Sequence, residues 1–410
     1  MRTREEARAR DAADPLRGLR DRFDLPEGIT YLDGNSLGAL PRATAARMAE
    51  AVRDEWGRGL VRSWNAAGWI GAPARVGGKI ARLVGADPHE VLVADSTSVN
   101  LYKLLAAAVK ARPGRRVILS EPGNFPTDLY VAQGVAEMLG DIEVRLAARD
   151  AIIDALDEDV AVLLLTHVHY RSAAMFDMAA ITRAAQDEGA LVLWDLSHSA
   201  GAVPVDLNGA GADLAVGCGY KYLNGGPGAP AFLFVAERHQ AALRSPLSGW
   251  MGHAAPFDFG DDYAPGAGMA RFLCGTPPIL GLAALEEGVD LLLGADVPAL
   301  HAKGQALCSA FIDCVEERCA GLGLTLATPR DPAARGSHVS FRHARSWPVM
   351  QALIARGVIG DFRAPDILRF GFTPLYVGFE DAWNAAEALR DILVTGAWDD
   401  LAYHARAAVT

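Results

Sequence analysis

The feature that most constrains the fold is a regular alternation of strand-like and helical stretches between residues 60 and 290. Short apolar runs bounded by turn residues are typical of buried strands. They occur at 115–122, 160–168, 189–195, 212–218 and 229–236. Apolar residues at helical spacing predict helices at 98–111, with Ser98 as its cap, and at 178–190. Strand, helix and strand in succession predict parallel pairing, with both faces of the sheet covered.

A change of pattern after residue 295 predicts a second domain. A helical stretch around 297–320 is followed by strand candidates near 337–343 and 367–376. A chain of 410 residues is too long for one compact core and suits a large domain plus a smaller one. We expect a large domain at 46–290, a smaller α+β domain at 291–410, and an N-terminal segment, 1–45, that packs with the smaller domain.

Composition excludes several classes of protein. The net charge of −11 argues against a nucleic-acid partner, because phosphate backbones select concentrated positive charge. No apolar segment has the length of a membrane helix. The N-terminal 23 residues mix arginines with acids, so they predict a solvated helix and not a transit peptide. The five cysteines form no C-x-x-C pair, and we expect reduced thiols in a cytoplasmic protein.

Two polar stretches follow predicted strands. In "LVLWDLSHSAG", Asp195 ends a strand and His198 lies three positions later. Ligands of open α/β sheets bind outside the carboxyl ends of the strands. A capping aspartate and a loop histidine are the simpler alternative. In "SEPGNFPTDLY", Phe125 could stack on a ring and Asp128 could act as an acid or acceptor, although an ordinary loop would also explain this stretch.

A third stretch, "DSTSVNLYK", places three consecutive hydroxyl residues at a predicted helix start. Helix N-termini bind phosphate through their unsatisfied N–H groups and the helix dipole. Capping explains one hydroxyl well, but it explains three less well. Thr97 and Ser98 are therefore candidate phosphate ligands.

The fourth stretch, "GCGYKYLNGGPGAP", places Lys221 among glycines and tyrosines, with no acid nearby in the sequence. A desolvated amine loses proton affinity and becomes a nucleophile toward a carbonyl. The hydroxyl-rich helix start, the strand-end carboxylate of Asp195 and the flat side chain of Phe125 are the groups that pyridoxal 5'-phosphate requires. The combination predicts a lysine that binds this cofactor, with Asp195 as partner of the ring nitrogen.

The chain resembles the kynureninases, which are fold-type-I pyridoxal-phosphate enzymes. The resemblance runs from "YLDGNSLGALP" (31–41) to "LRFGFTPLY" (368–376) and includes "YKYLNGGPG", "SGWMGH" and "FLCGTPPIL". It implies an α/β large domain with a mostly parallel seven-stranded sheet and a smaller α+β domain. It also implies hydrolysis of L-kynurenine, with possible use of 3-hydroxykynurenine, to anthranilate and L-alanine in tryptophan catabolism.

The resemblance assigns roles to individual residues. Lys221 would be the Schiff-base lysine, Asp195 the partner of the ring nitrogen, and Tyr220 a relay for protons. The homodimer that it implies would share each phosphate site between its subunits. The other implied cofactor residues are Thr97, Ser98, Phe125, Asp128, Thr166, His198 and Tyr220, with Trp250 and Thr276 from the neighbouring subunit. The implied substrate residues are Arg369 for the α-carboxylate, Trp64 for the ring, with a buried core position as its alternative, and Asn35 of "GNSLG".

The sequence departs from the family pattern after Tyr170. Many relatives have Thr-Gly where this chain has Ser172 and Ala173. Glycine can adopt backbone angles that alanine resists, so the loop conformation near Thr166 is open at this stage.

The sequence also fits other functions of the same fold. A cysteine desulfurase or lyase of the same fold would need a reactive thiol near the site, for which Cys218 and Cys274 are poorly placed; an aminotransferase is a further option. A pyridoxal-phosphate-binding regulator or an inactive relative is the non-enzyme alternative. His167 and His169 could face one side of a strand as metal ligands, but no third ligand has suitable spacing, so no metal is expected.

Overall fold

The computed structural model describes residues 1–406. Its chain forms two compact units, which we describe separately. The large unit comprises residues 44–167 and 176–290. The terminal unit comprises residues 1–43, 168–175 and those from 291 onward. Residues 168–175 leave the large unit and return to it, an excursion that the apolar pattern of the sequence does not reveal.

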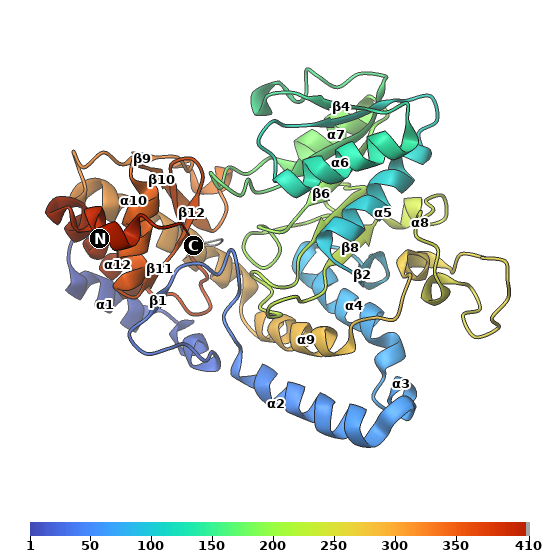
Figure 1. The fold of residues 1–410 in the computed structure, drawn as a ribbon, viewed down its shortest axis with the longest axis horizontal. Coiled ribbons are helices and arrows are strands. Elements are labelled where there is room, and N and C mark those ends of the chain that lie inside the picture. The colour runs from blue at the N-terminus through green and yellow to red at the C-terminus, as the bar shows by residue number, and fades with distance from the viewer. Residues whose placement is uncertain (407–410) are drawn as a thin grey trace. The chain divides into compact units, whose positions relative to one another are not determined.

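A seven-stranded sheet forms the centre of the large unit (Figure 1). The strand order is β2-β8-β7-β6-β5-β3-β4, and in this sheet β8 runs opposite in direction to the other six strands. The mostly parallel seven-stranded architecture is thus confirmed. The strands are β2 (Val91–Val93), β3 (Val117–Ser120), β4 (Glu143–Leu146), β5 (Val160–Thr166), β6 (Leu191–Asp195), β7 (Leu214–Gly217) and β8 (Phe232–Val235).

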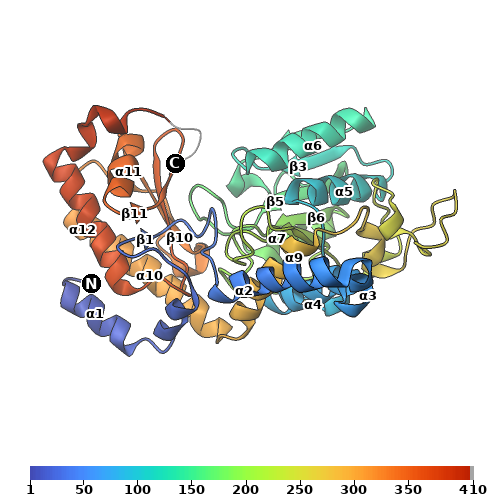
Figure 2. The same cartoon turned by 60° about the horizontal axis from the view of Figure 1, so that its bottom comes forward.

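Helices cover both faces of this sheet. Leu193 packs with the apolar residues of α5 (Thr97–Lys110) in one buried cluster, and α6 (Pro126–Leu139) lies beside α5 in both views (Figures 1 and 2). The next residue, Trp194, donates from Nε1 to Thr182 Oγ1 of α7 (Met178–Asp187) at 3.1 Å. Because successive strand residues point to opposite faces, α5 and α7 lie on opposite sides of the sheet.

The remaining helices of the large unit lie before and after the sheet strands in sequence. α4 (Ala72–Val84) packs against β2. α2 (Arg42–Glu50) continues into a π-helical stretch, Ala51–Gly59, and α9 (Ile279–Leu293) ends this part of the chain. Two short helices are α3 (Ser63–Ala66) and α8 (Glu237–Gln240).

The terminal unit contains a four-stranded antiparallel sheet in the order β12-β13-β10-β9. Near the N-terminus, β1 (Thr30–Tyr31) pairs in parallel with β11 (Val358–Ile359). The sheet strands are β9 (Thr325–Leu326), β10 (His338–Arg342), β12 (Asp361–Arg363) and β13 (Ile367–Gly371). The helices are α1 (Arg4–Ala13), α10 (Val297–Arg318), α11 (Ser346–Ala355) and α12 (Phe379–Thr395).

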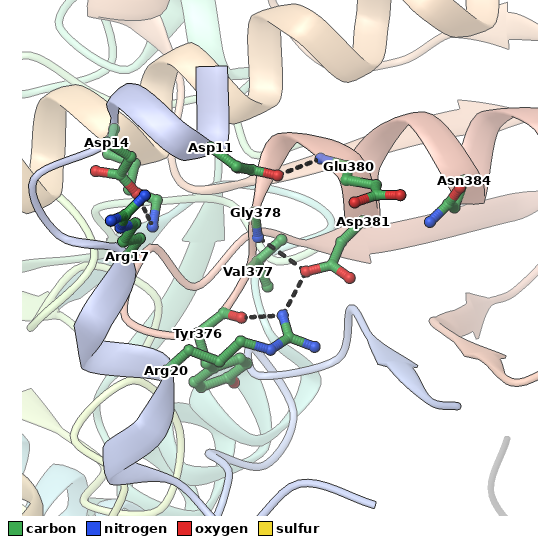
Figure 3. Close-up of a pocket in the computed structure, with 11 residues that line it drawn as sticks. Asp11, Asp14, Arg17, Arg20, Tyr376, Val377, Gly378, Glu380, Asp381 and Asn384 are labelled. Carbon is green, nitrogen blue, oxygen red and sulfur yellow. Dashed lines mark hydrogen bonds and ion pairs between the residues drawn. The ribbon is translucent and has the colours of Figure 1, made fainter. Parts of the chain in front are cut away.

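Charged side chains of the N-terminal segment form hydrogen bonds with the start of α12 (Figure 3). The carboxylate of Asp11 accepts from the backbone N–H groups of Phe379 and Glu380, at 2.7 and 2.9 Å, and so caps the helix. Arg20 donates to the carbonyl of Tyr376 at 2.6 Å and to Asp381 at 2.5 Å. The Asp11 contacts join α1 to α12, and the two helices lie side by side in both ribbon views (Figures 1 and 2).

Candidate active site

The carboxyl ends of the parallel strands collect the polar residues of the large unit. Thr166 ends β5 and lies in register with Asp195, the last residue of β6. Val216 of β7 pairs with Asp195, and the chain then turns into the loop that carries Lys221. Parallel strands bring their carboxyl ends to one edge of the sheet, as the sequence predicted.

Asp195 is buried at this edge and is fixed by the residues that follow it. Ser197 donates to Asp195 Oδ1 twice, from the backbone N–H at 2.8 Å and from the hydroxyl at 2.6 Å. Burial raises the pKa of Asp195, while the Ser197 hydrogen bonds and the charge of Lys221 oppose the rise. In this buried environment, a cation beside Asp195 would strongly stabilise its ionised form.

Asp128 is a second buried carboxyl at the same edge. It lies in the first turn of α6, and the Thr166 hydroxyl is 3.1 Å from its Oδ2. Burial raises the pKa of Asp128 well above its usual range, and the charge of Asp195 raises it further. Two buried acids that repel each other indicate a site that accepts positive charge.

Asn124 and Ser197 are site residues that the sequence reasoning missed. The Thr166 hydroxyl lies 2.5 Å from Asn124 Oδ1, which also accepts from the backbone N–H of Phe125 at 2.7 Å. Asn124 donates to the Ser120 hydroxyl at 3.2 Å. Asn124 and Ser197 lie inside the stretches "SEPGNFPTDLY" and "WDLSHSAG", so these motifs were the available signal.

Lys221 is buried at this edge, with 8% of its surface exposed. Its Nζ lies 3.4 Å from His198 Nε2. The same nitrogen is 5.8 Å from the centre of the Phe125 ring and 5.7 Å from that of Tyr220. The structure therefore brings the amine, an imidazole and two aromatic rings together at the edge of the sheet where Asp195 and Asp128 lie.

Close backbone packing places the lysine loop. A Cβ on Gly219 would lie 2.3 Å from the carbonyl oxygen of Pro230, and one on Gly217 would lie 2.4 Å from the ring of Phe232. A side chain at either position would push the loop off β8. Gly217 and Gly219 of "GCGYKYLNGG" are therefore explained by packing, because the chain just before Tyr220 has no room for a side chain at either position.

The start of α5 lies beside a pocket of about 530 Å³, lined by Ser96, Asp95, Tyr220, Gly228, Ala229, Pro230 and Pro278. Ser96, and not Ser98, caps this helix, with its hydroxyl accepting from the N–H of Val99 at 3.4 Å. The predicted cap was therefore wrong by two residues, because any of the adjacent hydroxyls can serve. Thr97 and Ser98 form the first turn and remain candidate phosphate ligands.

The two residues expected to serve a neighbouring subunit are exposed on this chain. Trp250 is 40% exposed, and its ring meets that of Phe257 edge to face at 5.9 Å. Thr276 is exposed in the segment before α9.

Trp64 is half-buried and packs edge to face on Trp69 at 5.8 Å, so it is neither a core residue nor a free surface residue.

Arg369 and Asn35 belong to the terminal unit. Arg369 is buried and is held by Asp361 through two ionic hydrogen bonds, from Nε at 2.7 Å and from Nη2. Its other donors reach Ser36 Oγ at 2.9 Å and the carbonyl of Tyr170 at 2.7 Å. The amide of Asn35 is fully buried, and within residues 1–406 neither its oxygen nor its nitrogen has a hydrogen-bond partner.

Ala173 adopts the left-handed conformation, with φ of 61°. Its N–H donates to the carbonyl of His169 at 2.8 Å, and its own carbonyl accepts from Gly336 at 2.8 Å. The chain therefore forms a turn here with alanine at this position. Alanine occupies the conformation that glycine favours, at an energetic cost.

The thiols do not form a reactive cysteine site. Cys218 is buried, and burial raises its pKa, which disfavours the thiolate. Cys274 is half-buried, with Sγ 3.7 Å from a carboxylate oxygen of Asp95. Neither environment is the electropositive one that activates a cysteine nucleophile.

Among residues 1–406, no group of three or more His, Cys, Asp and Glu side chains is arranged to bind a metal ion. In the same part of the chain, none of the helices combines the length and apolar composition needed to cross a bilayer.

In the terminal unit, a pocket of about 380 Å³ lies between α1 and α12 (Figure 3). Its charged side chains already pair with each other, Asp14 with Lys303 at 2.8 Å and Arg20 with Asp381. We assign it no ligand.

Comparisons with known proteins show which family the chain resembles along its whole length. Over 416 aligned residues, covering 100% of each chain, the protein is 56% identical to the kynureninase of Burkholderia mallei (strain SAVP1). It is 51% identical, at the same coverage, to the kynureninase of Pseudomonas fluorescens. The family model described as kynureninase C-terminal domain matches residues 300–389.

Solved structures share the fold at low identity. A variant of C-DES with glycine covalently linked to its PLP cofactor aligns with a TM-score of 0.79 and 16% identity, covering 90% of this chain and 98% of that one. The apo cysteine desulfurase of Thermococcus onnurineus NA1 gives 0.78 and 19%, covering 92% and 98%. These likenesses confirm the fold class, and the full-length identities confirm the resemblance seen in the sequence: the chain belongs to the kynureninase family.

Proposed function

We propose that the protein is a pyridoxal-phosphate-dependent hydrolase that cleaves the Cβ–Cγ bond of L-kynurenine to give anthranilate and L-alanine. Membership of the kynureninase family over the whole chain supports this reaction. The observation that carries the proposal is the position of Lys221 Nζ, 3.4 Å from His198 and 5.8 Å from the Phe125 ring, with its charge acting on the buried Asp195 and Asp128.

The residues at the sheet edge fit the cofactor. Asp195 and Asp128 supply a negative environment for a protonated ring nitrogen, and Phe125 supplies a flat surface for the ring. The start of α5, with Thr97 and Ser98, supplies N–H and hydroxyl donors for a phosphate. When bound to Lys221, pyridoxal phosphate draws electrons away from the α-carbon of an amino acid.

The chain's own residues then move protons and hold the substrate. Asp195 would hold a proton at the ring nitrogen, and Thr166 and His198 would border the cofactor. Lys221 takes the α-proton of the substrate, and Tyr220, its neighbour, relays protons to the reacting group. A positioned proton transfer contributes about 10²- to 10⁴-fold to the rate, so loss of the Tyr220 hydroxyl should slow turnover without emptying the site.

The substrate carboxylate is assigned to Arg369. Its planar guanidinium suits bidentate recognition of a carboxylate. Asp361, Ser36 and the Tyr170 carbonyl fix its orientation. Asn35 and Trp64 are assigned to the remainder of the substrate, with Trp64 toward its aromatic ring.

A homodimer completes the proposed site. Trp250 and Thr276, which are exposed on this chain, are assigned to the phosphate of the neighbouring subunit. Exposed apolar side chains of the large unit, among them Trp56, Leu60 and Val61, support a protein partner on this unit.

The reaction is tested by adding L-kynurenine to the purified protein and following anthranilate by its fluorescence. We expect anthranilate and alanine in equal amounts. Formation of a protein persulfide from cysteine, or transfer of the amino group to a keto acid without anthranilate, would instead identify one of the alternative enzymes.

A further inference from the structure

Lys103 is a fully buried lysine that the proposed reaction does not use. It lies in the second turn of α5, with none of its side chain exposed. Its Nζ is 2.7 Å from Asp95 Oδ2 and 2.7 Å from the carbonyl oxygen of Phe272. A buried ammonium is costly unless it is paired and hydrogen-bonded, so these two contacts hold it in place.

The contact with Asp95 fixes the entrance of α5. Asp95 has φ of 50°, a left-handed conformation that few residue types tolerate, and it immediately precedes the capping Ser96. Its carbonyl accepts from the N–H of Ala231 at 2.9 Å, which ties it to the start of β8. Asp95 and Ser96 both line the pocket that Tyr220 borders. Lys103 thus orients the residue that sets the direction of the first helical turn.

The contact with Phe272 fixes a different segment. Two residues later, the Sγ of Cys274 lies 3.7 and 3.8 Å from the carboxylate oxygens of Asp95. The carbonyl of Cys274 accepts from the N–H of Met251 at 3.2 Å. A Cβ on Gly249 would lie 2.3 Å from that carbonyl oxygen, so the backbones pack closely. The segments that carry Trp250 and Thr276 therefore both contact one cluster, which consists of Lys103, Asp95, Phe272 and Cys274.

We propose that Lys103 is a positioning residue for two phosphate sites at once. Through Asp95 it orients the start of α5, which serves the site of its own subunit. Through Phe272 and Cys274 it orients Trp250 and Thr276, which serve the site of the neighbouring subunit. The proposal rests on the proposed function, because it takes the cofactor and the dimer from there.

The first test compares two substitutions on one helix. Lys103→Met should weaken pyridoxal-phosphate binding by about 10- to 100-fold, because charged hydrogen bonds to the cluster are lost. Affinity for pyridoxal, which lacks the phosphate, should not change. The control is Lys110→Met, at an exposed position of the same helix, which should leave both affinities unchanged. Equal weakening of both ligands by Lys103→Met would mean a general structural role and would overturn the proposal. If Lys103→Met does not fold, Asp95→Asn replaces it in the test. This variant should also bind pyridoxal phosphate more weakly and pyridoxal with unchanged affinity.

The second test uses hybrid dimers purified with two affinity tags. One subunit is unchanged, and the other carries Lys221→Ala with or without Lys103→Met, so only the unchanged subunit can attach the cofactor. We expect Lys103→Met in the altered subunit to weaken cofactor binding in the unchanged one. Equal affinities would refute the link to the neighbouring site. A Lys221→Ala hybrid without any bound cofactor would instead refute the proposed function, and this inference with it.

Discussion

Ala173 is an alanine in a left-handed backbone conformation, which has an energetic cost. Its φ of 61° suits glycine, and a left-handed L-residue is destabilised by about 1 kcal/mol or more. Ala173→Gly should therefore raise the free energy of unfolding by about 1 kcal/mol, measured by urea denaturation. Ala9→Gly, at an exposed position of α1, is the control and should lower it by a similar amount. Destabilisation by both changes would show that Ala173 is not strained.

Asp33 predicts a pH dependence of stability. Burial and the nearby charge of Asp361 raise the pKa of Asp33 to about 7, from an ordinary value near 4. Between these values the folded chain keeps a proton that the unfolded chain has lost. Stability contributed by this group therefore falls as the pH rises from about 4 to about 7, and it stays low above that.

Replacing Asp33 by Asn should remove that part of the pH dependence. Thermal unfolding at pH 5 and pH 8 measures it. The loss of stability from pH 5 to pH 8 should be smaller in the variant than in the unchanged protein. The difference between the two proteins is the quantity to compare, because Asp128 and Asp195, whose pKa values are also raised, contribute in the same direction. Parallel pH profiles would contradict the account.

At the scale of elements, α9 supports the loop that carries Lys221. A Cβ on Gly288 would lie 2.1 Å from the carbonyl oxygen of Leu223 and 2.9 Å from the backbone of Asn224. Gly288→Ala should therefore displace the loop, with lower stability and weaker cofactor binding. Gly134→Ala, in α6, has open space at this position and should raise stability by about 1 kcal/mol. Unfolding and cofactor titration check both variants, and unchanged cofactor affinity in Gly288→Ala would contradict the packing argument.

The sequence predicts the buried elements well and the edges poorly. β5 and β6 are continuous apolar runs because both faces of the sheet are covered, and both strands were expected. β4, "EVRL", is a partly exposed edge strand without such a run and was not expected. The antiparallel direction of β8 was also not expected, because an apolar run carries no information on direction.

Some residues of the candidate site could likewise be predicted from the sequence, and others could not. Asp195, Asp128 and Lys221 were found because charged residues beside apolar strands are unusual in a sequence. Asn124 and Ser197 were missed because short polar side chains in loops are common, and only their hydrogen bonds distinguish them. The transfer of residues 168–175 to the terminal unit depends on tertiary contacts, which no local pattern reports.

At the scale of the whole molecule, the account predicts a dimer of 43.5 kDa chains in analytical ultracentrifugation. The stretch that follows α2 exposes four large apolar side chains, each by at least 43%: Val52, Trp56, Leu60 and Val61. Trp56→Glu should raise the dimer dissociation constant about tenfold or more. It should also weaken cofactor binding, because the subunits of the proposed dimer would share the phosphate sites. The control is Val394→Glu, on α12, which should change neither. An unchanged protein that is monomeric and still binds the cofactor fully would contradict the shared site.

The central claim is that Lys221 binds pyridoxal phosphate covalently. The chain has only five lysines, namely Lys79, Lys103, Lys110, Lys221 and Lys303, so peptide mapping after borohydride reduction is decisive. We predict that the reduced cofactor is found on the peptide containing Lys221 and is absent from the Lys221→Ala protein. Cofactor attached to another lysine, or to none, would contradict the account.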